Sequence, residues 1–181
     1  MTEIVPQSPA KTGLPLGILF GIIMILEFVV SYVLNIDPIS NPAVGTTMNV
    51  LNYLVLPILF ITLACNNYKK AHAGYVTFGE CLKIGVTLCV IAGLVYAVFS
   101  VIFNLIFPEF IDEIMSKMRS VMISQAPDMP AEQLEMALSW TRKMMSPAFV
   151  FPITIIMYAF IGLIISLIVG AIVKKDKPVS F

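Results

Sequence analysis

Four long apolar runs constrain this chain more than any other feature of its sequence. They cover residues 15–34, 44–64, 84–107 and 148–173. A transmembrane helix needs about 20 consecutive, mostly apolar residues to cross the hydrocarbon core of a bilayer, and every run reaches that length. The sequence therefore predicts an all-α fold, a bundle of four transmembrane helices.

The composition agrees with a chain that folds in lipid. Hydrophobic residues make up 59% of the 181 residues and charged residues only 12%, whereas soluble domains have about 25% charged residues. Outside the four runs no stretch is suited to form a large soluble core, so we expect a single membrane domain over residues 1–181. The formal net charge is zero and the sequence has no basic stripe. Nucleic acid is therefore not an expected partner.

The charged residues of the connections predict the orientation of the bundle, because short loops rich in Lys and Arg stay in the cytoplasm. Seven basic residues fall at the N-terminus, around the second connection and in the C-terminal tail: Lys11, Lys69, Lys70, Lys83, Lys174, Lys175 and Lys177. The opposite side carries four: Lys117, Arg119, Arg142 and Lys143. We therefore expect both termini to be cytoplasmic, and an even number of spans is consistent with this arrangement.

Small residues recur at every fourth position in three of the runs, which places them on one face of each helix. They are Gly13, Gly17 and Gly21, then Cys81, Gly85, Cys89, Gly93 and Ala97, and finally Gly162, Ser166 and Gly170. Helices in lipid associate by close packing, so we interpret these stripes as helix–helix interfaces. We favour interfaces within one chain, with a homodimer as the alternative. In the second run, Pro57 lacks a backbone N–H and is expected to kink the helix.

Glu27 lies deep inside the first apolar run, where a charge costs at least about 2.5 kcal/mol and marks a functional hypothesis. The functional interpretation is a relay for a proton or a cation. The structural interpretation, which we favour because no second acidic or basic residue lies within a run, is a protonated carboxyl that donates a hydrogen bond within the bundle. The candidate intramembrane polar site comprises Glu27, Ser31, Asn49, Asn52, Tyr96 and Asn104.

Residues 108–147 are too long for a bare loop. Apolar residues recur at helical spacing from Phe110 to Met122, and the sequence Ala-Pro-Asp-Met-Pro at 126–130 interrupts the pattern. We therefore predict an extracytoplasmic helical hairpin between the third and fourth spans, with Asp128 capping its second helix. The candidate partner surface of this hairpin comprises Met115, Met118, Met122 and Trp140.

The sequence predicts no cofactor, metal site or catalytic site. The three methionines at 115, 118 and 122 are soft ligands of the kind that hold Cu(I), but no external His or Cys accompanies them, so packing or a partner surface is the favoured role. Three cysteines, Cys65, Cys81 and Cys89, indicate buried thiols rather than a disulfide framework. His72 is the only histidine, and HExxH, GxSxG and P-loop motifs are missing, so we do not expect an enzyme.

The second connection and the start of the third run resemble a known family. Residues 74–85, Gly-Tyr-Val-Thr-Phe-Gly-Glu-Cys-Leu-Lys-Ile-Gly, resemble the T-F-G-E-x-x-K-x-G signature of small bacterial integral membrane proteins catalogued as domain of unknown function 4199. Pro108-Glu109-Phe110 and the Lys174-Lys175 tail resemble it too. The resemblance implies four spans, a longer segment between the third and fourth, and a location in the bacterial inner membrane. It implies no activity, and Glu27 is not part of its pattern.

Two functions follow from these features. The favoured one is a non-catalytic protein that scaffolds or regulates a membrane-protein partner through the external hairpin. The alternative is a proton- or ion-coupled transport element that uses Glu27, with Pro57, Asn49 and Asn52 in support. A chain of four spans would serve transport as an oligomer, so the lipid bilayer, another membrane protein and a second copy are the expected partners.

Overall fold

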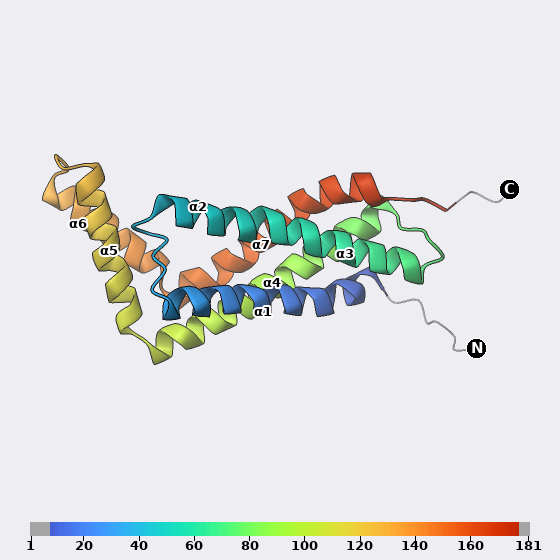
Figure 1. Ribbon diagram of the computed structural model, residues 1–181, viewed down its shortest axis with the longest axis horizontal. Helices are drawn as coiled ribbons and strands as arrows, with labels where there is room; N and C mark the ends of the chain where they lie inside the picture. The colour runs from blue at the N-terminus through green and yellow to red at the C-terminus, as the bar shows by residue number, and fades with distance from the viewer. Residues whose placement is uncertain (1–7, 178–181) are drawn as a thin grey trace.

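The computed structural model describes residues 8–177, and its regular structure there is helical apart from one isolated β-bridge. The elements in chain order are α1 (Pro9–Val33), α2 (Pro42–Val50), the π-helical turn η1 (Leu51–Val55), α3 (Leu56–Ala71), α4 (Phe78–Ile106), α5 (Glu109–Gln125), α6 (Ala131–Met144) and α7 (Pro147–Val173). Four long helical rods lie along the molecule, and α5 and α6 stand across one end of it (Figure 1). We call this the hairpin end, and the opposite end, where α1 begins and α7 finishes, the terminal end.

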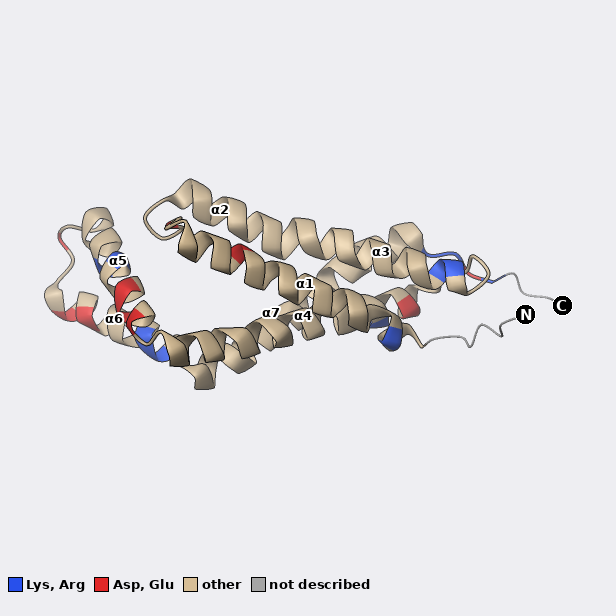
Figure 2. Cartoon of the chain, turned by 60° about the horizontal axis from the view of Figure 1, so that its bottom comes forward, with Lys and Arg blue, Asp and Glu red and all other residues tan. Residues whose placement is uncertain are grey.

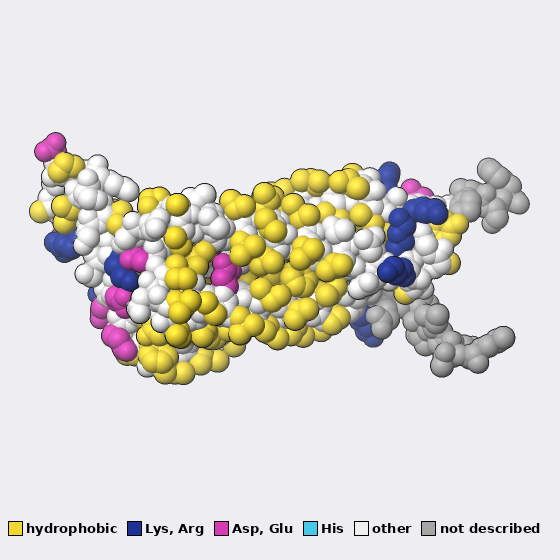
Figure 3. Space-filling model, in the orientation of Figure 1, with side chains coloured by type: hydrophobic (Ala, Val, Ile, Leu, Met, Phe, Trp, Pro, Cys, Tyr) yellow, Lys and Arg dark blue, Asp and Glu magenta, His cyan; other side chains and the backbone are white. Residues whose placement is uncertain are grey.

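Four helical segments are long and apolar enough to cross a membrane: α1, the continuous segment Pro42–Ala71 formed by α2, η1 and α3, α4, and α7. They match the four predicted spans, so the predicted all-α bundle is confirmed. At the terminal end α1, α3 and α4 extend beyond the apolar runs, because polar and basic residues continue the helices there. Hydrophobic side chains cover much of the face shown in Figure 3, as a lipid-facing surface requires.

The predicted hairpin is also confirmed, as the pair α5 and α6. Two ion pairs join its helices, Arg119 to Glu135 at 2.7 Å and Arg142 to Asp112 at 2.6 Å. Figure 2 shows acidic and basic residues gathered at this end and again at the terminal end, with few between. The predicted cap of α6 was wrong: α6 has Pro130 at its N-cap position and no side-chain cap.

The third span begins with a capping box, a pattern in which the side chain and backbone of Thr77 pair with those of Glu80. Thr77 is the N-cap of α4, and its hydroxyl accepts a hydrogen bond from the Glu80 backbone N–H at 3.3 Å. The Glu80 carboxylate in turn accepts one from the Thr77 backbone N–H at 2.7 Å. This reciprocal pair satisfies two N–H groups that a helix start leaves without partners. The same turn is tied to the C-terminal tail by two backbone hydrogen bonds between Val76 and Lys175.

Helix α4 is the centre of the bundle and packs most extensively against α1 and α7. The glycines of α1 lie directly on the α4 backbone: a Cβ at Gly13 would be 2.7 Å from the Ile84 carbonyl oxygen, and one at Gly17 would be 2.6 Å from that of Leu88. On the other side of α4, a Cβ at Gly162 of α7 would be 2.8 Å from the Cys89 Cβ. The small-residue stripes therefore close interfaces within one chain, as the sequence predicts.

Large and small apolar side chains fill the space between the four rods. Phe20, Ile61, Ile84 and Leu88 are fully buried, and the rings of Phe20 and Phe60 stack with centroids 5.4 Å apart. The three cysteines are free and buried, in agreement with their interpretation as packing residues: Cys65, Cys81 and Cys89.

The disturbance expected at Pro57 takes the form of a π-helical turn. The Leu56 backbone N–H donates to the carbonyl of Leu51, five residues earlier, rather than four. A proline has no N–H to donate and its ring crowds the carbonyl four residues before it, here that of Tyr53. The wider turn just before Pro57 accommodates the ring. Such single π turns occur often at functional sites.

Because Gly17 touches the α4 backbone, Gly17→Ala should destabilise the bundle by about 1–3 kcal/mol, the usual cost of overpacking. The measurement is unfolding of the detergent-solubilised protein by a graded addition of denaturing detergent. Gly79→Ala is the matched control, since a Cβ there meets nothing within 4 Å, and it should not lower stability. Equal stability of the two variants would contradict the packing of α1 on α4.

Candidate ligand-binding cavity

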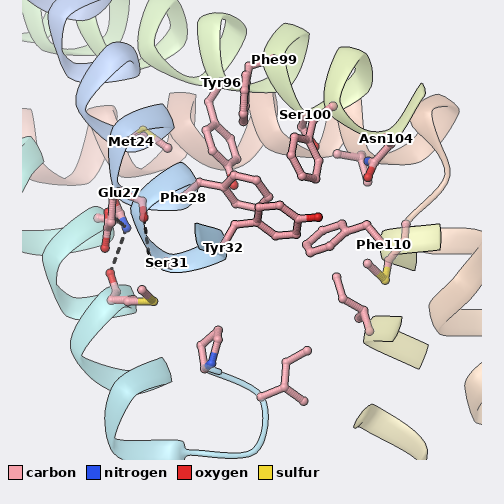
Figure 4. Close-up of a pocket in the computed structure, with 18 of the residues that line it drawn as sticks. Met24, Glu27, Phe28, Ser31, Tyr32, Tyr96, Phe99, Ser100, Asn104 and Phe110 are labelled. Carbon is pink, nitrogen blue, oxygen red and sulfur yellow. Dashed lines mark hydrogen bonds between the residues drawn. The ribbon is translucent and has the colours of Figure 1, made fainter. Parts of the chain in front are cut away.

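A cavity of about 710 Å³ opens between the spans at the hairpin end. Its walls come from the last turns of α1, from α2 and η1, from the last turns of α4, from the first turns of α7, and from α5, which lies over it. Figure 4 shows side chains from several of these elements turned toward one space. Pockets of about 300–1,000 Å³ hold drug-sized ligands.

All six residues of the candidate polar site line this cavity: Glu27, Ser31, Asn49, Asn52, Tyr96 and Asn104. They come from three different spans, so the tertiary fold brings together groups that the sequence shows only separately. Their hydrogen bonds, however, differ in part from the one that the sequence suggested, a bond donated by the Glu27 carboxyl.

Glu27 and Asn52 form the polar centre of the site. The Asn52 side-chain amide donates to the Glu27 carboxylate with a nitrogen–oxygen distance of 2.6 Å, and it also donates to the Met48 backbone carbonyl at 3.1 Å (Figure 4). Asn52 lies within η1, so the π-helical turn that accommodates Pro57 also sets the position of this donor.

The Ser31 side chain bonds to the backbone of Glu27 rather than to its carboxyl group. Its hydroxyl donates to the backbone carbonyl of Glu27 at 2.8 Å, one turn back along α1. Asn104 lies across the cavity, and its side-chain oxygen is buried without a hydrogen-bond partner among the described residues. The side-chain oxygen of Asn52 is likewise buried without a hydrogen-bond partner among these residues. Buried polar atoms normally have a partner, and these two therefore mark acceptor positions for a bound group or for water.

Aromatic rings form much of the remaining wall, and sequence reasoning missed them. Phe28 and Tyr32 of α1 meet Phe103 of α4 edge to face, with centroids 4.9 and 5.2 Å apart. Phe110, in the first turn of α5, packs edge to face on Phe28 and on Tyr32 at 5.6 and 5.7 Å. These contacts tie the hairpin to the bundle. The four-residue spacing from Phe28 to Tyr32 was the available signal, because it places both rings on one helix face.

Charged groups of the hairpin and of the α1–α2 loop lie at the mouth of the cavity. The Lys117 ammonium is 2.7 Å from Glu113 and 3.7 Å from Asp37. Its hydrogen bond with Glu113 raises the pKa of Lys117. Partial burial alone would raise the pKa of Asp37, but hydrogen bonds from Ser40 and Ile39 and the charge of Lys117 hold it below its usual value. Lys117 and Asp37 are thus both charged at neutral pH.

The candidate partner surface of the hairpin divides in the structure. Met115, Met118 and Met122 of α5 are half-buried, on a hairpin whose buried side chains are Leu134 and Leu138 of α6. Trp140 is 58% exposed, and the Lys143 ammonium lies 5.3 Å from its ring centroid. The methionines thus lie less open than the tryptophan, and their expected role in packing rather than in copper binding stays a prediction.

Comparison with known proteins finds one family. A family model described as "Protein of unknown function (DUF4199)" matches residues 15–175, which is nearly the whole chain. No curated protein and no solved structure matches the chain.

Loss of Asn52 should be costly, because Asn52→Leu leaves the Glu27 carboxyl without its donor. We expect the free energy of unfolding to fall by about 1–3 kcal/mol, the usual cost of orphaning a buried polar group. Thermal unfolding in detergent measures this. Asn49→Leu is the control: Asn49 lines the same cavity but makes no side-chain hydrogen bond among residues 8–177, and its substitution should change stability by about 0.5 kcal/mol or less. Similar losses for the two variants would argue against the Glu27–Asn52 bond.

Proposed function

The chain belongs to the DUF4199 family of proteins of unknown function. From that premise we propose that it is a non-catalytic membrane protein that binds a proton or a small cation at Glu27. The single observation that carries the proposal is the Glu27 carboxyl, held by Asn52 at 2.6 Å within a cavity of about 710 Å³. The proposed role is a proton- or ion-coupled transport element. It replaces the scaffold as the favoured function.

The energy of a buried charge supports this choice. A carboxylate at the centre of a bilayer costs at least about 2.5 kcal/mol and is normally paired with a cation. The ion pairs found among residues 8–177 all lie at the hairpin end and none includes Glu27. A hydrogen bond from a neutral amide lowers the cost of the charge but does not neutralise it. A proton or an external cation supplies the missing positive charge.

Transport also needs a site that can exchange its occupant. The Glu27 side chain is only partly buried, and the cavity that it lines also includes residues of the α1–α2 loop and of α5 at the hairpin end. The π-helical turn beside it gives the second span a place where a small change of hydrogen bonding would move Asn52. Because four spans are few for a transporter, we propose that a homodimer is the working unit.

The proposed location is the inner membrane of a bacterium, with both termini in the cytoplasm. The distribution of charge supports this orientation, because seven basic residues are associated with the terminal end and four with the hairpin. Figure 2 shows basic residues at the terminal end of the bundle, among them those in the last turn of α3. In this orientation the cavity faces the extracytoplasmic side.

The scaffold remains the second candidate, because one face of the hairpin is apolar and open. Three large apolar side chains of α6 are more than half exposed: Met136 at 56%, Trp140 at 58% and Met144 at 52%. Aromatic residues and methionine are enriched where proteins bind one another. The same face also suits the headgroup region of a membrane, where tryptophan is common.

The transport proposal predicts that the chain reconstituted in liposomes lets protons through in response to a potassium diffusion potential. A pH-sensitive dye inside the vesicles reports the flux. Glu27→Gln keeps an oxygen that can accept the Asn52 hydrogen bond but removes the titratable group, so the flux should fall at least tenfold.

Glu132→Gln is the matched control, because Glu132 is exposed on α6 and does not line the cavity, and it should keep the full flux. A wild-type protein no more permeable than empty vesicles would contradict the transport role. So would equal flux through Glu27→Gln. Either result would favour the scaffold.

A further inference from the structure

We propose that the cavity binds a lipophilic organic cation, meaning a molecule with one positive charge on an aromatic or aliphatic body, and that this molecule reaches Glu27 from the bilayer. The inference rests on the proposed function in taking Glu27 as the group that binds charge. It adds the chemical class of the ligand and its path of access.

The balance of charge in the walls selects a cation. Three carboxyl groups line the cavity, those of Glu27, Asp37 and Glu113, against one ammonium group, that of Lys117. Lys117 is already engaged with both acidic groups at the mouth. Glu27 lies deeper and has an amide as its hydrogen-bond partner. A positive charge placed beside Glu27 would therefore gain attraction at low dielectric without displacing an existing ion pair.

The remaining residues of the cavity wall are suited to an organic cation rather than to a bare metal ion. Divalent cations such as Ca²⁺ take about 6–8 oxygen ligands, but no group of three or more His, Cys, Asp or Glu side chains suited to a metal occurs in residues 8–177. Aromatic rings surround the space instead, including Phe28, Tyr32, Phe99 and Tyr96. The faces of such rings attract organic cations, and the rings also bury an apolar body.

The shape of the bundle gives this ligand a lateral route. Helix α1 packs on α3 and α4, whereas α1 and α2 make few contacts with each other. Next to Glu27 on α1, Leu26 is 57% exposed and Val30 is 50% exposed, and both lie on the surface that faces lipid.

Figure 3 shows acidic atoms interrupting the hydrophobic band partway along the molecule. The described parts of the four spanning helices contain two acidic residues, Glu27 and Glu80, and Glu80 lies in the first turn of α4 at the terminal end. Glu27 is therefore the acidic residue that lies within the apolar part of a described span. A carboxyl that borders the lipid-facing surface is open to a solute that dissolves in the bilayer and carries a charge.

The test uses two probes of the same shape and opposite charge, tetraphenylphosphonium and tetraphenylborate. Isothermal titration of the full chain in detergent, corrected for empty micelles, should show saturable binding of the phosphonium and none of the borate. Glu27→Gln should weaken phosphonium binding at least tenfold, which corresponds to about 1.4 kcal/mol. Glu132→Gln should bind as the wild type does. Size-exclusion chromatography of each variant confirms that it is folded.

A second variant tests the wall independently of the charge. Phe99→Leu keeps an apolar side chain but removes a ring that faces the cavity, and it should weaken phosphonium binding while leaving Glu27 intact. Equal binding of the two probes, no binding of the phosphonium, or an unchanged affinity in Glu27→Gln would each overturn the inference.

The outcomes separate this inference from the proposed transport role. If proton flux depends on Glu27 but the phosphonium does not bind, the ligand class is wrong and the role of Glu27 stands. If the phosphonium binds through Glu27 but the vesicles show no flux, the binding site stands and the transport role is wrong.

Discussion

The close approach of α1 and α7 to opposite sides of α4 is the constraint on which the rest of the structure depends. Gly13 and Gly17 let the α1 backbone lie against the carbonyl groups of α4, and Gly162 does the same for α7 against Cys89. In lipid this packing has to supply attraction that the hydrophobic effect supplies in water. The glycines of α1 end at Gly21, and after Met24 the same helix presents carboxyl, hydroxyl and aromatic groups.

This change along α1 explains why the cavity described above forms at the hairpin end of the bundle. At the terminal end small residues let the helices touch, and the interior is filled with fully buried side chains such as Ile84 and Leu88. At the hairpin end Phe28 and Tyr32 hold α1 away from α4 through ring contacts at about 5 Å. Bulky rings space helices farther apart than glycines do, so polar groups beside them face an open space. The hairpin covers that space through Phe110, which contacts both rings of α1.

The sequence predicted those features that depend on local pattern. Apolar length identified the four spans, the Thr77–Glu80 spacing identified the start of α4, and four-residue periodicity identified the interfaces. Glu27, Asn52 and Asn104 were selected because each is polar within an apolar run, and the fold places them around one cavity. That these three residues belong to a site was predictable from the free-energy cost of placing a polar group in lipid, whereas their hydrogen-bond partners were not predictable.

What the sequence did not reveal depends on contacts between distant segments. The bond between Glu27 and Asn52 requires the register of α1 against η1, and a π-helical turn shifts that register by one residue. The aromatic wall combines rings of α1, α4 and α5, which no single periodic pattern contains. The cap expected from Asp128 failed for a similar reason: α6 begins after Pro130, and Asp128 lies too far before that start to satisfy its first N–H groups.

The proposed role requires that Glu27 exchange protons within the membrane. Infrared difference spectroscopy of the protein in lipid, recorded at a series of pH values, observes carboxyl protonation directly. We expect a carboxylic C=O band that grows as pH falls and that is missing from the Glu27→Gln spectra. If the two sets of spectra have the same carboxyl bands at every pH, Glu27 does not titrate, and the proposed role of the cavity is contradicted.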